Sequence, residues 1–233
     1  MNRLLKTLSM LVLIAGISGC AGDRNHNAVP ADTPEPGPPK PAKAAGTDHR
    51  PIIVALGDSL TAGRGLGPTE NYPAKLQAKL DAKGYRYRVV NAGVSGDTSA
   101  QGLNRLQVIR SLRPALVIVE LGANDGLRGI PVEQTQSNLN EIVSTLKEDG
   151  VTVVLAGMEI PPNYGPEYTR QFRLMFRDIA AKYRVPLIPF FLQGVAGIPD
   201  LNQEDGIHPT ARGNDLVTEN VWRILEPLLK TGA

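Results

Sequence analysis

From residue 51 onward, short apolar segments alternate with longer segments in which apolar residues recur at helical spacing. The short segments are rich in Val, Ile and Leu and lack polar alternation, which is typical of strands buried on both faces of a parallel sheet. These predicted strands span residues 52–56, 88–90, 116–121, 151–156 and 187–190. The predicted helices span residues 72–83, 98–112, 132–148, 167–184 and 210–229. Five strands with helical crossovers predict a three-layer α/β/α fold.

Two glycines and one proline mark helix ends in this pattern. Gly84 and Gly150 each follow a predicted helix, at the position where a glycine commonly ends it. Pro131 suits the first turn of the helix at 132–148. The roughly 180 residues of this part are enough for one domain with a sizeable core.

The N-terminus has the composition of a targeting segment. Arg3 and Lys6 precede an apolar stretch at 8–17 that is too short to span a bilayer. The stretch leads into Ile-Ser-Gly-Cys at 17–20, which resembles a bacterial lipobox, and Cys20 is the single cysteine of the chain. We therefore predict a lipoprotein signal peptide over residues 1–19 and lipidation of Cys20. An ordinary secretory signal and an uncleaved anchor are the alternatives.

Residues 20–50 form a predicted tether between the lipid and the domain at 51–233. The segment is poor in large apolar residues and rich in proline, so it cannot bury enough surface to fold. A proline-rich recognition motif is the less favoured alternative. Ala21 follows the cysteine, which favours delivery to the outer membrane of a Gram-negative cell. We thus predict a cell-envelope protein held on the outer membrane, facing the periplasm.

The charge balance argues against a nucleic-acid partner. The chain carries 25 basic and 23 acidic residues, and loss of Arg3 and Lys6 with the signal peptide leaves 23 of each sign. A single cysteine excludes a disulfide framework and a thiolate metal site. One domain histidine without cysteines does not suit a zinc site, so no metal is predicted.

Polar residues that can act on an ester gather where strands of the predicted sheet end. In open α/β sheets the carboxyl ends of the strands meet at one edge, and ligands bind there. The segment before the last helix belongs to the same edge. The four polar segments are 57–60 (Gly-Asp-Ser-Leu), 95–97 (Ser-Gly-Asp), 122–125 (Gly-Ala-Asn-Asp) and 205–208 (Asp-Gly-Ile-His).

These segments supply the parts of a serine hydrolase. Ser59 is the candidate nucleophile, and His208 is the candidate general base because His26 and His49 lie in the predicted tether. Asp205, three residues before His208, can orient the imidazole. Taken alone, Ser59 would be better explained as a helix-capping serine, and Asp205 and His208 as incidental polar residues of a loop.

Gly96 and Asn124 are candidates for an oxyanion hole. The backbone amide of Gly96 and the side-chain amide of Asn124 can both donate to a developing oxyanion, as can the turn amides at Ser59. Alone, each of Gly96 and Asn124 would be interpreted as a turn residue. We expect Asp125 to have a structural role, and Asp97 or Thr98 to cap the following helix.

Three better-known motifs do not fit the chain. Thr61 stands where G-x-S-x-G needs its last glycine, so the nucleophile elbow of the α/β-hydrolases is disfavoured. Arg64 stands where a phosphate-binding P-loop needs lysine, and Pro68 where G-x-G-x-x-G needs its last glycine. Residues 57–68 therefore match neither phosphate-binding motif.

The Ser, Gly, Asn and His of the four segments, in this order, resemble the SGNH, or GDSL, hydrolases. Within that family the chain is most similar to the bacterial thioesterase I/lysophospholipase L1/arylesterase group, on the blocks at 91–99, 121–129, 162–165 and 205–209. The resemblance implies a flavodoxin-like parallel sheet of order 2-1-3-4-5. It implies an oxyanion hole formed by the amides of Ser59 and Gly96 and the side chain of Asn124.

The resemblance also implies a cofactor-independent hydrolase of acyl esters, including arylesters and lysophospholipids, and of acyl thioesters. Its substrate is then a small acyl ester or a lipid, and the loop at 158–164 borders the site. We expect Leu127, Ile160 and Pro162 to line the acyl pocket, with simple packing of a proline-rich connection as the alternative. An O-deacetylase of envelope polysaccharide and a non-catalytic envelope lipoprotein are the other functions considered.

Overall fold

The computed structural model describes residues 48–230. The signal peptide, Cys20 and nearly all of the predicted tether lie outside the described residues. A five-stranded parallel sheet forms the centre of the domain, with the order β2-β1-β3-β4-β5. The predicted strand order is therefore confirmed. The strands are β1 (Ile52–Gly57), β2 (Arg88–Gly93), β3 (Leu116–Glu120), β4 (Thr152–Ala156) and β5 (Leu187–Ile188).

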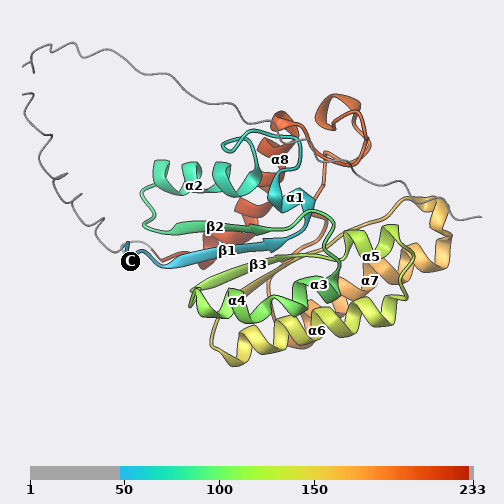
Figure 1. Cartoon of the computed structure of the whole chain (residues 1–233), viewed down its shortest axis with the longest axis horizontal. Helices are drawn as coiled ribbons and strands as arrows, with labels where there is room; N and C mark the ends of the chain where they lie inside the picture. The colour runs from blue at the N-terminus through green and yellow to red at the C-terminus, as the bar shows by residue number, and fades with distance from the viewer. Residues whose placement is uncertain (1–47, 231–233) are drawn as a thin grey trace, which may run out of the picture. The chain divides into compact units, whose positions relative to one another are not determined.

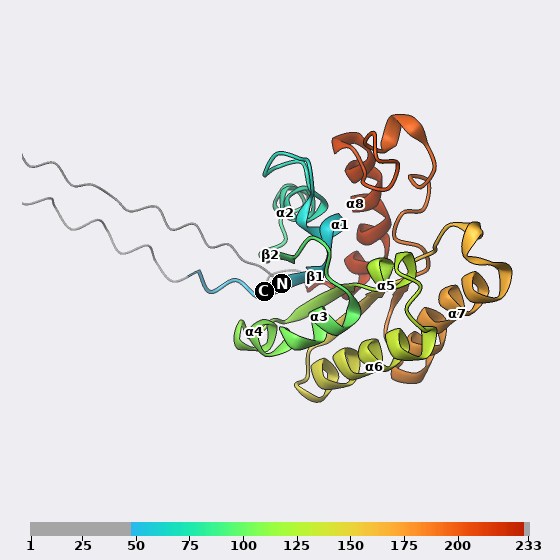
Figure 2. The same cartoon turned by 45° about the vertical axis from the view of Figure 1, so that its right-hand side comes forward.

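Helices cover both faces of the sheet. On one face lie α1 (Ser59–Ala62), α2 (Tyr72–Ala82) and α8 (Ala211–Leu225) (Figure 1). Figure 2 shows the remaining α-helices on the opposite face. They are α3 (Ser99–Asn104), α4 (Leu106–Ser111), α5 (Ala123–Leu127), α6 (Val132–Glu148) and α7 (Pro166–Tyr183). Three short 3-10 turns complete the fold: η1 (Pro162–Tyr164), η2 (Pro199–Leu201) and η3 (Glu226–Leu228).

The central strands are buried because both of their faces pack against helices. Every residue of β3 is buried, as are residues 53–57 of β1. These are the runs of Val, Ile and Leu whose lack of alternation predicted a doubly covered sheet. The edge strand β2 is only partly buried.

Local sequence signals explain most element ends. Gly84 and Gly150 follow α2 and α6 with φ of 78° and 77°, as predicted for residues that end helices. Pro131 is the residue before the first helical residue of α6, one position earlier than expected. β5 is shorter than predicted because Pro189 follows it and has no N–H to continue the ladder.

The helix predicted over 98–112 is two helices. It breaks at Arg105, which ends α3 and precedes α4 with φ −102° and ψ 10°. Thr98 caps α3 in a capping box with Gln101, as one of the two predicted capping residues. The sequence predicted one continuous helix because Leu106 and Ile109, which follow the break, are buried and continue the helical spacing of apolar residues.

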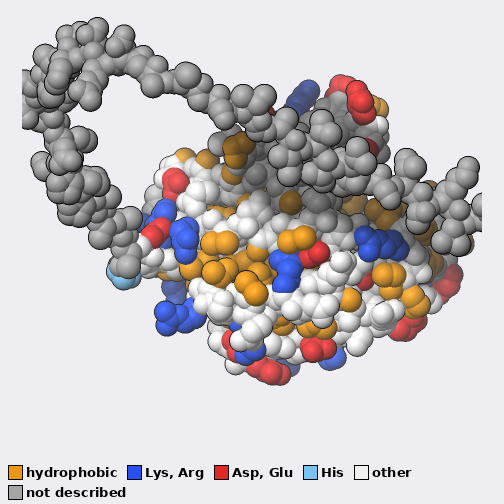
Figure 3. Space-filling view, viewed as in Figure 1, with side chains coloured by type: hydrophobic (Ala, Val, Ile, Leu, Met, Phe, Trp, Pro, Cys, Tyr) orange, Lys and Arg blue, Asp and Glu red, His pale blue; other side chains and the backbone are white. Residues whose placement is uncertain are grey.

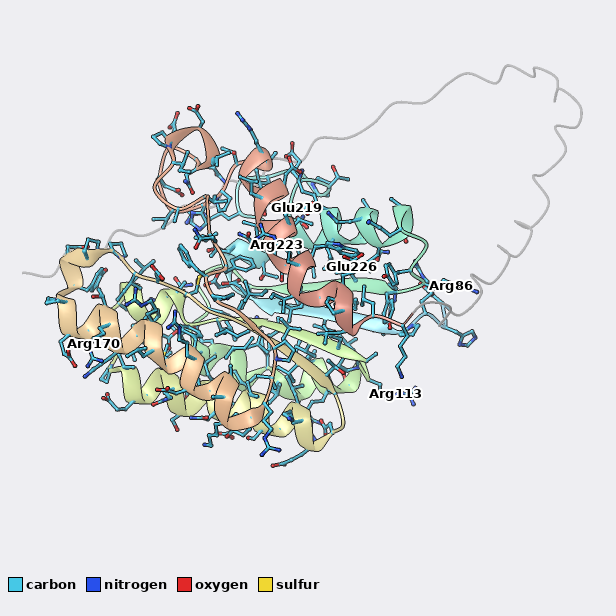
Figure 4. All side chains as sticks on the ribbon, turned by 180° about the vertical axis from the view of Figure 1, so that it is seen from behind. Arg86, Arg113, Arg170, Glu219, Arg223 and Glu226 are labelled. Carbon is cyan, nitrogen blue, oxygen red and sulfur yellow. The ribbon has the colours of Figure 1, made fainter. Side chains whose placement is uncertain are left out.

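Helices α2 and α8 also contact through charged side chains. Lys75 pairs with Asp215 and Lys79 with Glu219, which Figure 4 labels on α8. Exposed pairs of this kind contribute about 0–1 kcal/mol each, so the buried apolar residues of both helices supply most of the packing energy. On the face seen in Figure 3, basic and acidic side chains are interspersed. Within residues 48–230, no helix is long and apolar enough to cross a membrane.

Candidate active site

Ser59, His208 and Asp205 form a continuous hydrogen-bonded chain. Nε2 of His208 lies 2.8 Å from Oγ of Ser59, and Nδ1 of His208 lies 2.7 Å from Oδ2 of Asp205. Ser59 and His208 are buried. The structure thus brings together, within hydrogen-bond distance, the three residues that the sequence singled out. A base that contacts the nucleophile on one side and a carboxylate on the other can take up and return a proton.

Ser59 begins the one-turn helix α1, directly after β1. Asp58 caps this helix, since its Oδ1 accepts a 2.9 Å hydrogen bond from the amide of Leu60. Gly63 ends it with φ 78°, a conformation that glycine adopts without strain. The short turn therefore holds Ser59 at the carboxyl edge of the sheet.

A tight loop fixes His208 before α8. The amide of Gln203 donates to the carbonyl of His208 at 2.7 Å, and Asn202 and Pro209 form an isolated antiparallel bridge. Thr210 then caps α8 by accepting a hydrogen bond from the amide of Gly213. Because the backbone is held on both sides of His208, the imidazole has a defined position against Ser59.

Asp205 is held in its ionised form. Its Oδ1 accepts hydrogen bonds from the amides of Ile207 and His208, and Oδ2 contacts the imidazole. Partial burial raises the pKa of Asp205, but the hydrogen bonds from His208 and Ile207 outweigh burial and lower it to about 2. At neutral pH this carboxylate therefore orients the imidazole and stabilises it when it is protonated.

Gly96 and Asn124 lie in the wall of the same cavity as Ser59. Nδ2 of Asn124 donates to Oδ2 of Asp58 and to the carbonyl of Asp97, both at 3.0 Å. Gly96 has φ 89°, which a residue with a side chain rarely adopts, and its carbonyl accepts a hydrogen bond from Arg128. The loop that carries Gly96 is thereby tied to α5, which carries Asn124, and to Arg128 at its end.

Asp58 is a residue whose importance the sequence did not reveal. It is almost fully buried between Ser59 and Asn124, and burial raises its pKa to about 6 despite hydrogen bonds from Leu60 and Asn124 and the nearby His208. Its position before the one-turn helix was the available signal, because aspartate is a preferred helix cap. Asp58 holds the amide of Asn124 beside the nucleophile.

Asp125 has the structural role that the sequence predicted. Its carboxylate accepts hydrogen bonds from the amide and hydroxyl of Ser99, at 2.8 and 2.5 Å, and from the hydroxyl of Thr135 at 3.3 Å. These contacts join the start of α3 to α5 and α6. The carboxylate therefore orders the loop after β3 and lies outside the hydrogen-bonded chain of Ser59.

A cavity of about 590 Å³ opens beside Ser59 and His208. This size lies within the usual range for small-molecule sites. Leu127 and Ile160 line it as expected, whereas Pro162, the first residue of the turn η1, does not. Pro161 lines the cavity in its place. Met158, which also lines the cavity, belongs to the loop at 158–164 that was expected to border the site. The apolar wall residues that the sequence did not single out are Leu60 of α1 and, from loops, Phe190, Leu192 and Ile207.

The cavity wall also contains polar and charged side chains, which are Asp58, Arg64, Asn124, Glu159, Asn202 and His208 besides Ser59. Within the part of the chain that the structure describes, no group of three or more His, Cys, Asp or Glu side chains is arranged to hold a metal ion. The chemistry that the described residues offer is therefore that of a hydroxyl, an imidazole, a carboxylate and amide donors around one apolar cavity.

Comparisons with known proteins agree with this arrangement. Residues 55–216 match the model of the GDSL-like lipase/acylhydrolase family. The chain is 46% identical over 178 residues to the esterase TesA of Pseudomonas aeruginosa, which covers 76% of this chain and 89% of that protein. It is 38% identical over 188 residues to thioesterase 1/protease 1/lysophospholipase L1 of Escherichia coli K12, covering 80% and 88% of the two chains. A crystal structure of TesA superimposes with a TM-score of 0.74 at 45% identity, over 76% of this chain and 99% of that one.

Proposed function

Because the chain belongs to the GDSL-like lipase/acylhydrolase family and is an acyl-ester hydrolase, we propose that it works through an acyl-enzyme on Ser59. The observation that carries the proposal is the chain of contacts from Ser59 Oγ through His208 to Asp205. In the first step, Oγ of Ser59 bonds to the acyl carbon while Nε2 of His208 takes the hydroxyl proton. The ester or thioester bond then breaks, and the leaving oxygen or sulfur receives that proton.

The second step releases the acid. A water molecule gives a proton to Nε2 of His208 and attacks the acyl carbon of the acyl-enzyme. The bond to Oγ breaks, Ser59 regains the proton from His208, and the carboxylic acid leaves. Asp205 stays ionised throughout and stabilises the imidazolium, in keeping with its low pKa.

In both steps the carbonyl oxygen of the substrate becomes an oxyanion, which hydrogen-bond donors must stabilise. We assign them to the backbone amides of Ser59 and Gly96 and to Nδ2 of Asn124. Both N–H groups of Nδ2 donate within the protein, to Oδ2 of Asp58 and to the carbonyl of Asp97, which hold the amide beside Ser59. The assignment therefore requires one of these N–H groups to be shared with the oxyanion or to turn to it when substrate binds. Loss of one such donor typically lowers kcat by about 10²–10³.

For substrates, we propose arylesters and lysophospholipids, and also acyl thioesters. Apolar walls that include Leu127 and Ile160 favour an acyl chain over a sugar or a charged group on that side of the cavity. The relatives named esterase TesA and thioesterase 1/protease 1/lysophospholipase L1 support the same substrates. An acyl chain lying against Ile160 would make this residue a determinant of chain length.

We further propose that the protein belongs to the bacterial cell envelope and is held on the outer membrane, facing the periplasm, by a lipid on Cys20. The lipobox-like sequence before Cys20 and the proline-rich segment after it support this location. Metabolic labelling with an alkynyl fatty acid tests the anchor. Label on the wild type and none on Cys20→Ala is the expected result, and equal labelling contradicts the anchor.

Hydrolysis of p-nitrophenyl esters of graded acyl length tests the catalytic assignment. We expect turnover in the full chain, and none above background in Ser59→Ala or His208→Ala, with thermal unfolding showing that both variants are folded. Wild-type activity in either variant would refute the assignment. Activity on acetyl esters alone would favour a deacetylase, and the absence of labelling by a serine-directed phosphonate would favour a non-catalytic lipoprotein.

A further inference from the structure

Arg105 lies at the break between α3 and α4 and extends three hydrogen bonds toward the sheet. Its Nε donates to Oδ2 of Asp97 at 2.7 Å, Nη1 to the carbonyl of Ala92 at 2.6 Å, and Nη2 to the carbonyl of Gly57 at 2.8 Å. The side chain is only 21% exposed, and that of Asp97 only 8%. All three nitrogens of the guanidinium therefore donate to acceptors of the protein, and the group is mostly buried.

The three acceptors belong to segments that carry catalytic groups. Gly57 ends β1 two residues before Ser59, Ala92 lies near the end of β2, and Asp97 follows Gly96 directly. The carboxyl ends of β1 and β2 lie side by side in the sheet, with α3 beside them (Figure 1). One side chain thus joins the turn of the nucleophile to the loop of the oxyanion donor.

Asp97 extends this connection to the third donor. While its side chain accepts from Arg105, its carbonyl accepts a 3.0 Å hydrogen bond from Nδ2 of Asn124. A shift of Asp97 would therefore move both Gly96 and Asn124 relative to Ser59. Oxyanion donors act through fixed distances, and displacement by about 1 Å can cost roughly 10²-fold in rate.

We propose that Arg105 is a positioning residue that sets the distance between Ser59 and the oxyanion donors Gly96 and Asn124. The proposal rests on the proposed function of these three residues. A planar guanidinium is needed because its rigid fork directs separate N–H groups to the three acceptors, whereas the single ammonium of lysine cannot reach all of them in the same geometry. This requirement also explains the helix break, which leaves Arg105 free to point toward the strand ends.

The effect should appear in kcat and not in KM. Arg105 is not among the residues that line the cavity, so substrate binding should change little when it is replaced. We expect Arg105→Ala to lower kcat for p-nitrophenyl esters roughly 100-fold, and Arg105→Lys to lower it by a smaller factor. Guanidinium ion at low millimolar concentration should restore part of the kcat of Arg105→Ala, while methylammonium at the same concentration should not.

The matched control is Arg110→Ala. Arg110 lies on α4 and forms a two-point ion pair with Asp149, but this pair is exposed and Asp149 precedes the amino end of β4, whereas Ser59 follows the carboxyl end of β1. We expect Arg110→Ala to keep wild-type kcat and to show no response to guanidinium. Active-site titration with a fluorescent phosphonate gives the concentration of molecules with a reactive Ser59. Dividing the maximal rate by this concentration gives a kcat that is independent of misfolded protein.

Measurements on Ser59→Ala and Arg105→Ala distinguish an error in the role of Arg105 from an error in the role of Ser59. Turnover that survives in Ser59→Ala contradicts the nucleophile. Turnover that is lost in Ser59→Ala but kept per titrated site in Arg105→Ala contradicts the role of Arg105 alone. A loss in Arg105→Ala that guanidinium does not relieve, or that appears as a rise in KM with unchanged kcat, also overturns the positioning role.

Discussion

Glu120 is a fully buried carboxyl group at the end of β3, below the turn that carries Ser59. Its Oε2 accepts hydrogen bonds from the hydroxyl of Thr61 at 2.7 Å and from the amide of Asp58 at 3.4 Å. Its Oε1 has no hydrogen-bond partner among the described residues. Burial chiefly, and then the charge of Asp58, raises the pKa of Glu120 well above its ordinary value of 4.5, although the hydrogen bonds oppose the shift.

This shift predicts how stability depends on pH. The folded state binds the proton of Glu120 more tightly than the unfolded state does. The contribution to stability is therefore fully present below the unfolded pKa of about 4.5 and is lost as pH rises toward the folded pKa. One proton released on unfolding corresponds to a slope of about 1.4 kcal/mol for each pH unit.

Glu120→Gln is the perturbation that isolates this slope. Glutamine has nearly the same shape and can still accept the hydrogen bond from Thr61, but it does not titrate. We expect the free energy of unfolding of the variant, relative to the wild type, to rise with pH between 5 and 8 by up to about 1.4 kcal/mol per unit. Placing the glutamine NH₂ in the core lowers the free energy of unfolding by the same amount at every pH. This shifts the whole plot of unfolding free energy against pH but leaves its slope unchanged.

Urea unfolding at a series of pH values measures the difference. Asp58, whose pKa is raised to about 6, also titrates in this range and interacts with Glu120, so Asp58→Asn and the double variant complete a cycle that isolates the slope of Glu120. Glu133→Gln, which changes an exposed glutamate of α6, controls for the loss of one carboxylate from the chain. Parallel curves for Glu120→Gln and the wild type from pH 5 to 8 would refute the reasoning, because they would mean that folded Glu120 holds no proton that the unfolded chain releases in this range.

Four further outcomes are expected. Asn124→Ala should lower kcat by about 10²–10³, and phosphonate titration that still counts Ser59 would show that the loss is in turnover. Asp205→Asn should lower kcat by up to about 10⁴. Because the pKa of Asp205 is lowered to about 2, the stability that its carboxylate contributes is present above pH 3.8 and is lost as pH falls toward 2. The difference in unfolding free energy between Asp205→Asn and the wild type should therefore shrink as pH falls from 4 to 2. Ile160→Trp should shift the preferred p-nitrophenyl ester to shorter acyl chains, and an unchanged profile counts against the acyl pocket. Leu139→Ala in the buried face of α6 should cost about 2–5 kcal/mol in urea unfolding, with esterase activity per folded molecule unchanged.

The sequence by itself determined the layers of the domain and the edge of the sheet where the candidate active site lies. Apolar runs without alternation predicted β1, β3 and β4, because strands covered on both faces need apolar residues at every position. Gly84 and Gly150 marked helix ends through their backbone freedom. The positions of Ser59, Gly96, Asn124 and His208 were predictable because parallel strands bring their carboxyl ends to one edge.

Contacts between distant segments decided what the sequence pattern left open. At the helix break, Arg105 donates to Asp97 and to the carbonyl of Gly57, and periodicity cannot report a hydrogen bond to another element. The carboxyl group of Glu120 accepts a hydrogen bond from the amide of Asp58 and interacts with its charge because β1 and β3 are neighbours in the sheet. Local preference and burial determine which residues form strands and helices, while packing determines which polar groups meet, how far apart they lie and whether they carry charge.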